Sequence, residues 1–244
     1  MIFYDQLGCG NSARPADPAY CTIAYFVEEL ERVRAALGLD RTFILGQSWG
    51  TMLAVDYLLT KAPTGIAGLI LSGPCLNAAR FAADLRGYVA RLPGDIRNVI
   101  ERCEASGNYA APEYEGAVMT FYRRHVCRLD PWPACLQHTL EKMGLEAYNR
   151  MWGPSEFTLT GTLQDYDRTG RLSEIKLPTL FTCGRYDEAT PETTAFYHHS
   201  MPGSELVVFE DASHEHHLEK PEEFLAVVRD FLRRAEKICR NNVL

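Results

Sequence analysis

The 244-residue chain lacks a long apolar run, a secretion signal and a surplus of basic residues, and each absence excludes a class of protein. No stretch reaches the roughly 18 apolar residues of a membrane-spanning helix, and the N-terminus has no basic segment with an apolar core behind it. Lysine and arginine total 25 against 32 acidic residues, a net charge of −7, whereas general nucleic-acid binders are usually basic. We therefore expect a cytoplasmic protein without a membrane or nucleic-acid partner.

The chain also lacks paired cysteines. Eight cysteines are scattered along it, none in a CxxC pair or at zinc-ligand spacing from histidine. Without a signal peptide, this pattern is typical of a reducing compartment and of small buried side chains. A bridge between Cys127 and Cys135 is the one pairing left open, and nothing in the sequence calls for a metal or an organic cofactor.

The order of apolar segments predicts an α/β protein with a mostly parallel sheet and helices on both faces. The expected strands are short apolar runs at 2–4, 42–45, 67–71, 178–183 and 205–209. The expected helices of this core are at 23–37, at 51–59 and from Pro221 onward. The length fits one large domain, or one domain with an insertion.

Residues 76–172 interrupt this alternation. They contain few β-branched runs, many aromatic, arginine and alanine residues, and helical segments at 78–92 and 112–128. We interpret them as a helical insertion between two parts of one core, 1–75 and 173–244.

A candidate nucleophile lies between the second expected strand and the helix after it. The sequence GQSWG at 46–50 matches GxSxG in the strand–turn–helix context that gives this motif its meaning. The turn lifts the Ser48 hydroxyl above the sheet, and the helix N-terminus favours developing negative charge. The backbone N–H of Trp49 is then the expected oxyanion donor. The alternative is a glycine-rich helix start with a capping serine.

A serine nucleophile needs a base, and the base needs an orienting carboxylate. In this fold the chain order is serine, acid, histidine. Asp187 follows the strand at 178–183 and His214 follows the strand at 205–209. Both therefore lie at carboxyl ends of strands, where ligand crevices open.

Alternatives to both residues stand close by in the sequence. Glu188 is a second candidate for the orienting acid. His216 and His217 compete with His214 for the role of base, and the three together also permit a surface metal site.

Six segments resemble those of the proline iminopeptidases, which are serine aminopeptidases of the α/β-hydrolase fold. They are FYDQLGCGNS at 3–12, GQSWGT at 46–51, MWGPSEFT at 151–158, GTL at 161–163, GRYDEATP at 184–191 and ASH at 212–214. They span nearly the whole chain, in order and with compatible spacing. The resemblance implies Ser48, Asp187 and His214 as the triad and the insertion as a cap over the site.

The resemblance also implies a use for two carboxylates. Glu156 and Glu188 match the glutamates that bind the free α-amino group of the substrate in the tricorn-associated branch of the family. An ammonium group held at a fixed distance from Ser48 would limit cleavage to one N-terminal residue. Without the resemblance, each glutamate reads as a surface charge or a helix-start charge. Trp152, Phe157 and Tyr186 are candidates for the wall of an apolar pocket or for plain core.

The expected function is a serine aminopeptidase that acts on short peptides with a free N-terminus and prefers proline or a small apolar residue. The alternatives are an amino-acid amidase or esterase on the same scaffold, and a non-catalytic binding protein. The oligomeric state stays open.

One family segment has no counterpart here. The family carries HGGPG, a source of the second oxyanion donor, before the strand that matches residues 2–4, and no such segment occurs in this sequence. We therefore expect the N-terminal strands of the fold to be missing, with a gap in the sheet beside the strand at 42–45. A fragment, an inactive member and a sheet completed by another chain are the three explanations.

Overall fold

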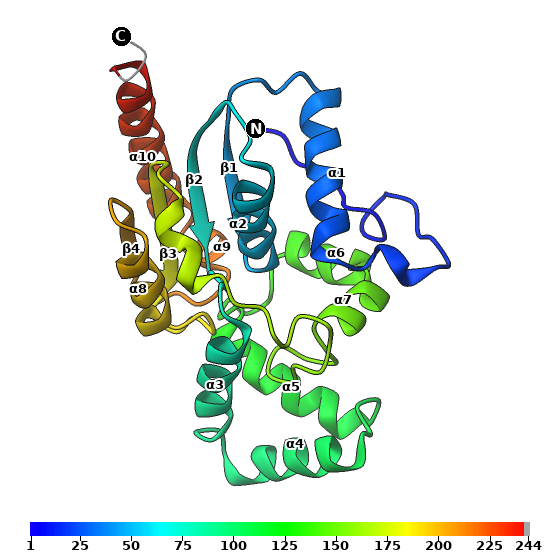
Figure 1. The fold of residues 1–244 in the computed structure, drawn as a ribbon. Helices are drawn as coiled ribbons and strands as arrows, with labels where there is room; N and C mark the ends of the chain where they lie inside the picture. Colours follow the sequence, from blue (N-terminus) through cyan, green and yellow to red (C-terminus); the bar gives the residue numbers. More distant parts are fainter. Residues whose placement is uncertain (242–244) are drawn as a thin grey trace.

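The computed structural model describes residues 1–241 and contains a four-stranded parallel sheet with the strand order β1-β2-β3-β4 (Figure 1). Its strands are β1 (Thr42–Gln47), β2 (Ile66–Ser72), β3 (Thr179–Gly184) and β4 (Glu205–Phe209). Each strand is parallel to its neighbour; Leu45 pairs with Ile70 and Leu71 with Phe181. The α/β class expected from the sequence is therefore confirmed.

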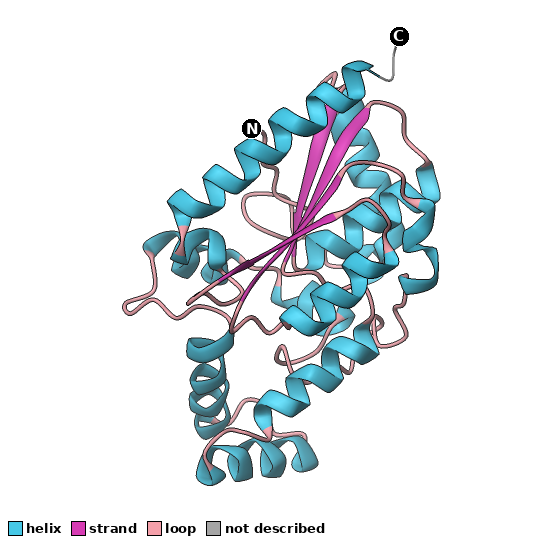
Figure 2. Ribbon diagram, turned by 90° about the vertical axis from the view of Figure 1, so that its left-hand side faces the viewer, coloured by secondary structure: helices cyan, strands magenta, loops and turns pink. Residues whose placement is uncertain are grey.

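Helices cover both faces of the sheet (Figure 2). The core helices are α1 (Ile23–Ala36), α2 (Trp49–Lys61), α8 (Pro191–Ser200), α9 (His216–Glu219) and α10 (Pro221–Asn241), with the 3₁₀ turns η1 (Pro18–Tyr20) and η2 (Thr169–Glu174). Each long core helix predicted from apolar periodicity is present within a few residues of its expected bounds.

Alternate residues of β2 face opposite layers, as side chains on a strand do. Leu69 and Leu71 pack with residues of α2 and α8 on one face, including Tyr197. Ile70 packs on the other face, with Phe231 of α10. All seven residues of β2 are buried, which explains why this strand reads as a continuous apolar run in the sequence.

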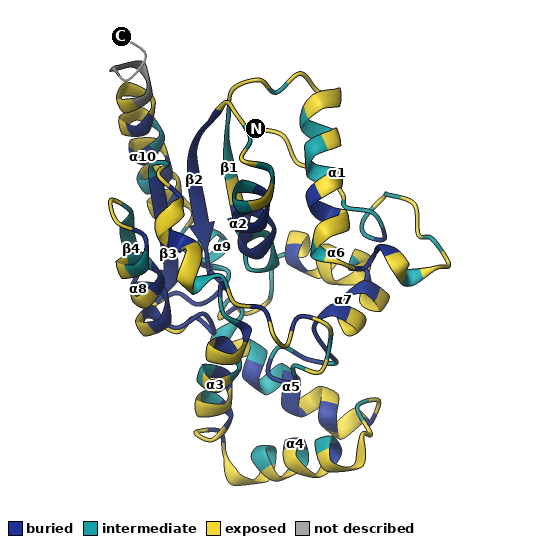
Figure 3. Cartoon of the chain, in the orientation of Figure 1, coloured by how far each residue is buried: buried dark blue, intermediate teal, exposed yellow. Residues whose placement is uncertain are grey.

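The segment between β2 and β3 is helical and lies beyond the carboxyl ends of the strands (Figure 1). Its helices are α3 (Ala78–Val89), α4 (Gly94–Ser106), α5 (Pro112–His125), α6 (Ala134–Lys142) and α7 (Leu145–Met151). One buried apolar cluster joins these helices to the core: Phe81 and Phe121 of the insertion belong to the same cluster as Phe26 and Met52. Exposed and intermediate residues make up most of α1 and α4 (Figure 3), and the buried residues of the two helices are Phe26, Val27, Ile100 and Cys103.

The prediction of a strand at residues 2–4 is wrong. No strand is assigned to that segment, and Ile2 and Phe3 are 56% and 84% exposed. An apolar run becomes a strand only where a neighbouring strand accepts and donates its backbone hydrogen bonds. Among residues 1–241, β1 has β2 as its one ladder partner, and Leu45 on β1 is 45% exposed.

The seven cysteines whose side chains are described are free thiols, and the side chain of Cys239 lies outside the described part. Cys127 is buried and Cys135 is exposed, so the bridge that the sequence left open does not form. Within the described residues, no helix has the length and apolarity needed to cross a membrane.

Candidate active site

Ser48 occupies a strained turn between β1 and α2. Its φ of 51° and ψ of −118° lie where residues with a side chain are rare, at a cost of about 1–3 kcal/mol. A Cβ at Gly46 would collide with the backbone carbonyl of Gly50, so this glycine of the motif allows the close approach that the turn requires. α2 begins at Trp49, whose N–H belongs to the first turn and has no intrahelical acceptor.

Asp187 and His214 form a buried, hydrogen-bonded pair. Asp187 Oδ1 lies 2.7 Å from His214 Nδ1, and the same carboxylate accepts from the backbone N–H groups of Ala189 at 2.8 Å and Gly184 at 3.2 Å. These bonds fix the carboxylate before it orients the imidazole. Gly73 packs against the ring, since a Cβ there would lie 2.6 Å from His214 Cε1.

The choice between Asp187 and Glu188 follows from the two nitrogens of the ring. Asp187 holds Nδ1, whereas Glu188 Oε1 lies 3.8 Å from Nε2 on the opposite side of the imidazole. The position of Asp187 therefore suits the orienting carboxylate, and that of Glu188 does not.

The charges around His214 favour its protonated form. Burial by itself lowers the pKa of the imidazole, but the charge and hydrogen bond of Asp187, with the charges of Glu188 and Glu215, raise it to about 10.

Ser48 is not hydrogen-bonded to this pair in the described part of the chain. Within residues 1–241 the structure has no hydrogen bond between Ser48 Oγ and His214, whose Nε2 faces Glu188 instead. Such bonds are often long in ligand-free enzymes and tighten when substrate binds.

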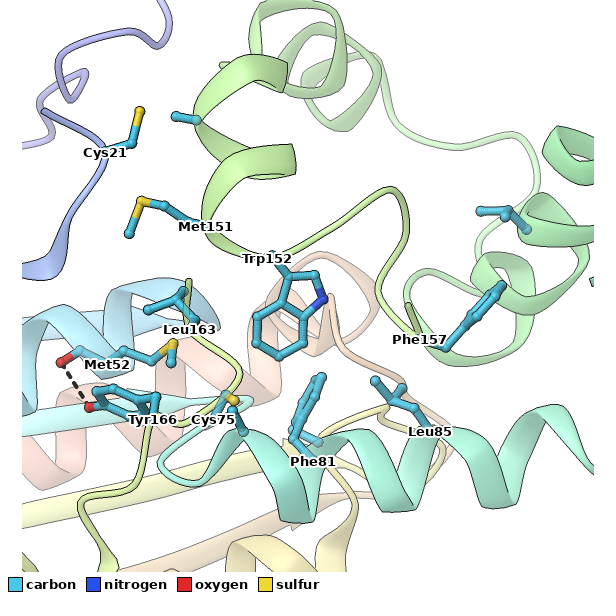
Figure 4. Close-up of a cluster of buried hydrophobic side chains, with 14 of the residues drawn as sticks. Cys21, Met52, Cys75, Phe81, Leu85, Met151, Trp152, Phe157, Leu163 and Tyr166 are labelled. Carbon is cyan, nitrogen blue, oxygen red and sulfur yellow. Dashed lines mark hydrogen bonds between the residues drawn. The ribbon is translucent and has the colours of Figure 1, made fainter. Parts of the chain in front are cut away.

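Ser48 lines a cavity of about 250 Å³, the Ser48 cavity, between the core and the insertion. Its polar wall includes Gln6 and Glu156. The remaining wall is largely apolar and includes Met52, Cys75, Phe81, Met151, Trp152 and Leu163, which Figure 4 shows grouped around the indole ring. The shape and polarity suit a small apolar side chain next to the nucleophile.

Two carboxylates stand near the site: Glu156 is half-buried and lines the Ser48 cavity, and Glu188 is buried beside the imidazole. Tyr148 donates its hydroxyl proton to Glu156 Oε1 at 2.9 Å. Glu188 is 1% exposed, and its Oε2 is buried without a hydrogen-bond partner in the described part of the chain. Burial raises the pKa of both carboxyls, and the charge of Glu156 raises the pKa of Glu188 further, well above its usual range.

This unpartnered oxygen is an acceptor in a place where buried polar groups are nearly always satisfied. A cationic donor would supply the missing bond and would also relieve the repulsion between the two carboxylates. The arrangement therefore suits an ammonium group.

The other predicted residues have separate places. Trp152 lines the Ser48 cavity, and its indole N–H donates to the Glu156 carbonyl at 2.9 Å. Phe157 is buried in the apolar cluster and is not among the residues that line the cavity, whereas Tyr186 is 40% exposed and lines another pocket.

The three neighbouring histidines do not form a metal site. His216 Nε2 lies 2.9 Å from Ser72 Oγ and 3.0 Å from Thr182 Oγ1, and burial lowers its pKa to about 4. His217 Nδ1 lies 3.5 Å from Glu215 Oε2. In the described residues, no group of three potential ligands is placed to hold a metal ion.

Several residues of the site were not predicted as such. Gln6 accepts a hydrogen bond from the Trp49 indole N–H at 3.0 Å, and Tyr122 and Tyr148 flank Glu156. Gln6 stands in a segment that carries the family resemblance, which is a usable signal. The tyrosines have none, because only the fold of the insertion brings them to the carboxylate.

Comparison with known proteins identifies the fold and the family. Residues 1–221 match the model of the α/β-hydrolase fold family. The proline iminopeptidase of Heyndrickxia coagulans is 47% identical over 233 residues, which cover 95% of this chain and 81% of that protein. The proline iminopeptidase of Saccharolobus solfataricus is 38% identical over 95% of this chain and 75% of its own.

Solved structures give the same assignment. The crystal structure of the proline iminopeptidase of Mycobacterium smegmatis superposes with a TM-score of 0.87 at 38% identity, covering 97% of this chain and 80% of that one. Esterases near 20% identity, such as one from Exiguobacterium antarcticum with a TM-score of 0.64, share the fold. The chain belongs to the proline iminopeptidase family of α/β-hydrolases.

Proposed function

We propose that the protein is a serine aminopeptidase that releases the N-terminal residue of short peptides, with proline or a small apolar residue preferred. The observation that carries the proposal is the buried, unpartnered Oε2 of Glu188 next to His214, with Glu156 at the Ser48 cavity. An enzyme that does not bind the substrate's amine would not need a buried and a half-buried acid there.

The chemistry is acyl transfer through Ser48. Its Oγ attacks the scissile carbonyl carbon while His214 Nε2 takes the hydroxyl proton, and Asp187 holds the ring in the required tautomer. The Trp49 N–H donates to the oxyanion of the tetrahedral intermediate. His214 then returns the proton to the leaving amine, and water hydrolyses the acyl-enzyme to release the amino acid.

The two carboxylates limit cleavage to the first residue of the peptide. The α-ammonium group of the peptide donates to Glu156 and Glu188, and each charge-assisted bond contributes about 1.5–3 kcal/mol. With the amine held there, the carbonyl that reaches Ser48 is that of the first residue, whose side chain enters the Ser48 cavity.

Substrate binding also prepares the base. An ammonium group next to Glu188 offsets a charge that raises the pKa of His214, and it repels the imidazolium. The bound cation therefore lowers the pKa of His214 and favours the neutral ring that accepts the serine proton.

We also propose that residues 76–172 act as a cap, flanked by core residues 1–75 and 173–244. The contributions of the insertion to the Ser48 cavity, Trp152 and Glu156 among them, support this division. The cytoplasmic location expected from the sequence stays a prediction.

Hydrolysis of prolyl and alanyl anilides tests the proposal. The wild-type protein should release aniline, Ser48→Ala should have no measurable turnover, and a fluorophosphonate should label the wild-type protein alone. Ser173→Ala is the matched control, because Ser173 is exposed on η2, and it should behave like wild type. A fully active Ser48→Ala would refute the assignment, and a chain that neither turns over nor labels would instead be the non-catalytic binding protein.

A further inference from the structure

A second pocket, of about 380 Å³, lies apart from the Ser48 cavity, where the C-terminal ends of α3 and α5 meet the loop after β3. We call it the arginine pocket. Its lining residues are Tyr88, Arg91, Arg124, His125, Arg128 and Tyr186. None of them takes part in the chemistry described above.

The guanidinium groups of the three arginines in this pocket have no acidic partner. In the part of the chain that the structure describes, none of the guanidinium groups of Arg91, Arg124 and Arg128 forms an ion pair, although acidic residues outnumber basic ones in this chain. The backbone N–H of Arg128 donates to Glu219 Oε1 at 2.5 Å, which leaves the Arg128 side chain unpaired. All three are exposed. An arginine offers five N–H donors in a planar fork that matches a carboxylate or a phosphate.

Aromatic rings hold two of these guanidinium groups in place. Arg91 lies over the Tyr88 ring at 4.6 Å, and Arg128 lies over the Tyr186 ring at 4.0 Å. These contacts use the faces of the guanidinium groups and leave the N–H edges free for a ligand.

His125 lines the pocket, and one of its ring nitrogens is free to bind a ligand. Its ring stacks on Tyr88 with a centroid distance of 3.9 Å, and Nδ1 lies 2.8 Å from the Tyr186 carbonyl oxygen, so Nδ1 carries the proton and Nε2 stays available. Burial lowers the pKa of His125, and the positive charges of Arg124 and Arg91 lower it further, whereas the hydrogen bond to the Tyr186 carbonyl and the charge of Asp187 raise it. Asp187, the negative group nearest in sequence to Tyr186, is bound to His214.

The arginine pocket is connected to the active site through the backbone. The His125 carbonyl accepts hydrogen bonds from the N–H groups of Glu188 at 3.3 Å and His214 at 3.1 Å, and Tyr186 directly precedes Asp187. A ligand that joined α3, α5 and this loop would therefore brace the segment that carries the acid and the base.

We propose that the arginine pocket binds an oxyanion, the phosphate or carboxylate group of a small ligand, and thereby ties the insertion to the loop after β3. Two sources supply this chemistry. One is a free phosphate compound, and the other is the C-terminal carboxylate of a peptide, an origin that rests on the proposed function.

Calorimetric titration of inorganic phosphate at constant low ionic strength tests the proposal, in parallel with N-acetylated tripeptides that end in a free acid or an amide. The acetyl group keeps these peptides from the ammonium site. We expect saturable binding of phosphate, of the free-acid peptide, or of both, weakened about tenfold or more in Arg124→Gln/Arg128→Gln, since each tenfold is about 1.4 kcal/mol. A rise in the pKa of His125 on binding, followed by NMR, locates the ligand.

Arg123→Gln is the matched control, because Arg123 is exposed on the same helix and does not line the pocket. An absence of saturable binding for both probes, or an equal loss in Arg123→Gln, would overturn the proposal. Selective binding of the free-acid peptide would identify the ligand as the C-terminal carboxylate of a substrate peptide. Binding of phosphate would identify it as a free phosphate compound.

The titrations are repeated in Ser48→Ala, which cannot turn over. The result for the arginine pocket is thus independent of the proposed function, and failure of one is distinguishable from failure of the other.

Discussion

At the residue scale, the proposed function gives Glu188 two roles, one toward the substrate and one toward the base. Its buried Oε2 has no hydrogen-bond donor in the described part of the chain, and its charge is one of those that raise the pKa of His214 to about 10. A residue that binds the substrate cation and also holds the general base protonated links recognition to activation.

Glu188→Gln keeps the size of the side chain and removes its charge, so two changes are expected. For free-amine substrates kcat/KM should fall roughly 10–100-fold, as for one lost charge-assisted bond. For an ester without an amine, activity rises with pH as His214 loses its proton, and the rise should move to lower pH because a charge that favours imidazolium is gone.

Steady-state pH profiles on both substrates measure these effects. Glu192→Gln, an exposed acid in the first turn of α8, is the control and should leave the profile in place. An unshifted ester profile in Glu188→Gln would contradict the electrostatic account of His214.

Gly73 is a positioning residue for the imidazole. In Gly73→Ala the new methyl group would press on His214, and the φ of +54° would be strained, at a cost of about 1–3 kcal/mol in unfolding free energy. Displacement of the ring should lower kcat by about 10²–10⁴, the usual contribution of general acid–base catalysis. Gly87→Ala has open space around the new methyl group and should retain full activity in the same assay.

The site residues that the sequence proposes are those with local signals. Ser48 stands in a strand–turn–helix motif, and Asp187 and His214 follow strands directly. The choice of Asp187 over Glu188 depended on which ring nitrogen each carboxylate faces. Gly73 carries no signal at all, because its role depends on a ring far along the chain.

At the element scale, a buried hydroxyl ties the nucleophile turn to the segment after β2. Thr51 Oγ1 donates to the Ser48 carbonyl at 2.6 Å and accepts from the Cys75 N–H at 3.1 Å. Thr51→Val has a similar shape but leaves a buried N–H unpaired, which should lower the unfolding free energy by about 1–3 kcal/mol. Urea denaturation measures this loss.

Thr120→Val is the comparison for this measurement. Its hydroxyl bonds only the Gly116 carbonyl one turn back on α5, at an exposed site. A change of less than about 0.5 kcal/mol is expected there, and equal losses in the two variants would contradict the assigned role of Thr51.

Helices and buried strands were predictable because their signals are local periodicities and apolar runs. The failure at residues 2–4 has the opposite cause. That run is apolar, but pairing depends on a partner strand that an apolar pattern cannot specify.

At the scale of the whole molecule, the site is shared between two parts of the chain. The core contributes Ser48 and Met52 to the cavity, and the insertion contributes Trp152 and Glu156. The order of elements predicted the fold and the insertion. The cavity and the arginine pocket were beyond prediction, since both depend on how the inserted helices pack on the core.

The apolar wall of the cavity should set the preferred first residue. Leu163→Ala enlarges the space next to Ser48 and should move the preference from proline toward larger apolar residues, with a stability loss of about 2–5 kcal/mol. Leu85→Ala is the control, because Leu85 is buried in the same cluster and is not among the cavity-lining residues. Leu85→Ala should lose stability without a change in the ratio of kcat/KM for proline substrates to kcat/KM for substrates with a larger apolar first residue. An equal change of this ratio in both variants would show that the cavity wall does not set the preference.

On the proposed function, Glu156 and Glu188 together recognise the free α-amine of the substrate. The most direct measurement is the ratio of kcat/KM for proline anilide to that for N-acetylproline anilide. We expect the wild-type protein to turn over the free amine alone, and we expect the ratio to fall toward one in Glu156→Gln/Glu188→Gln. Equal turnover of both anilides by the wild-type protein would contradict this recognition and would identify an amidase or esterase on the same scaffold.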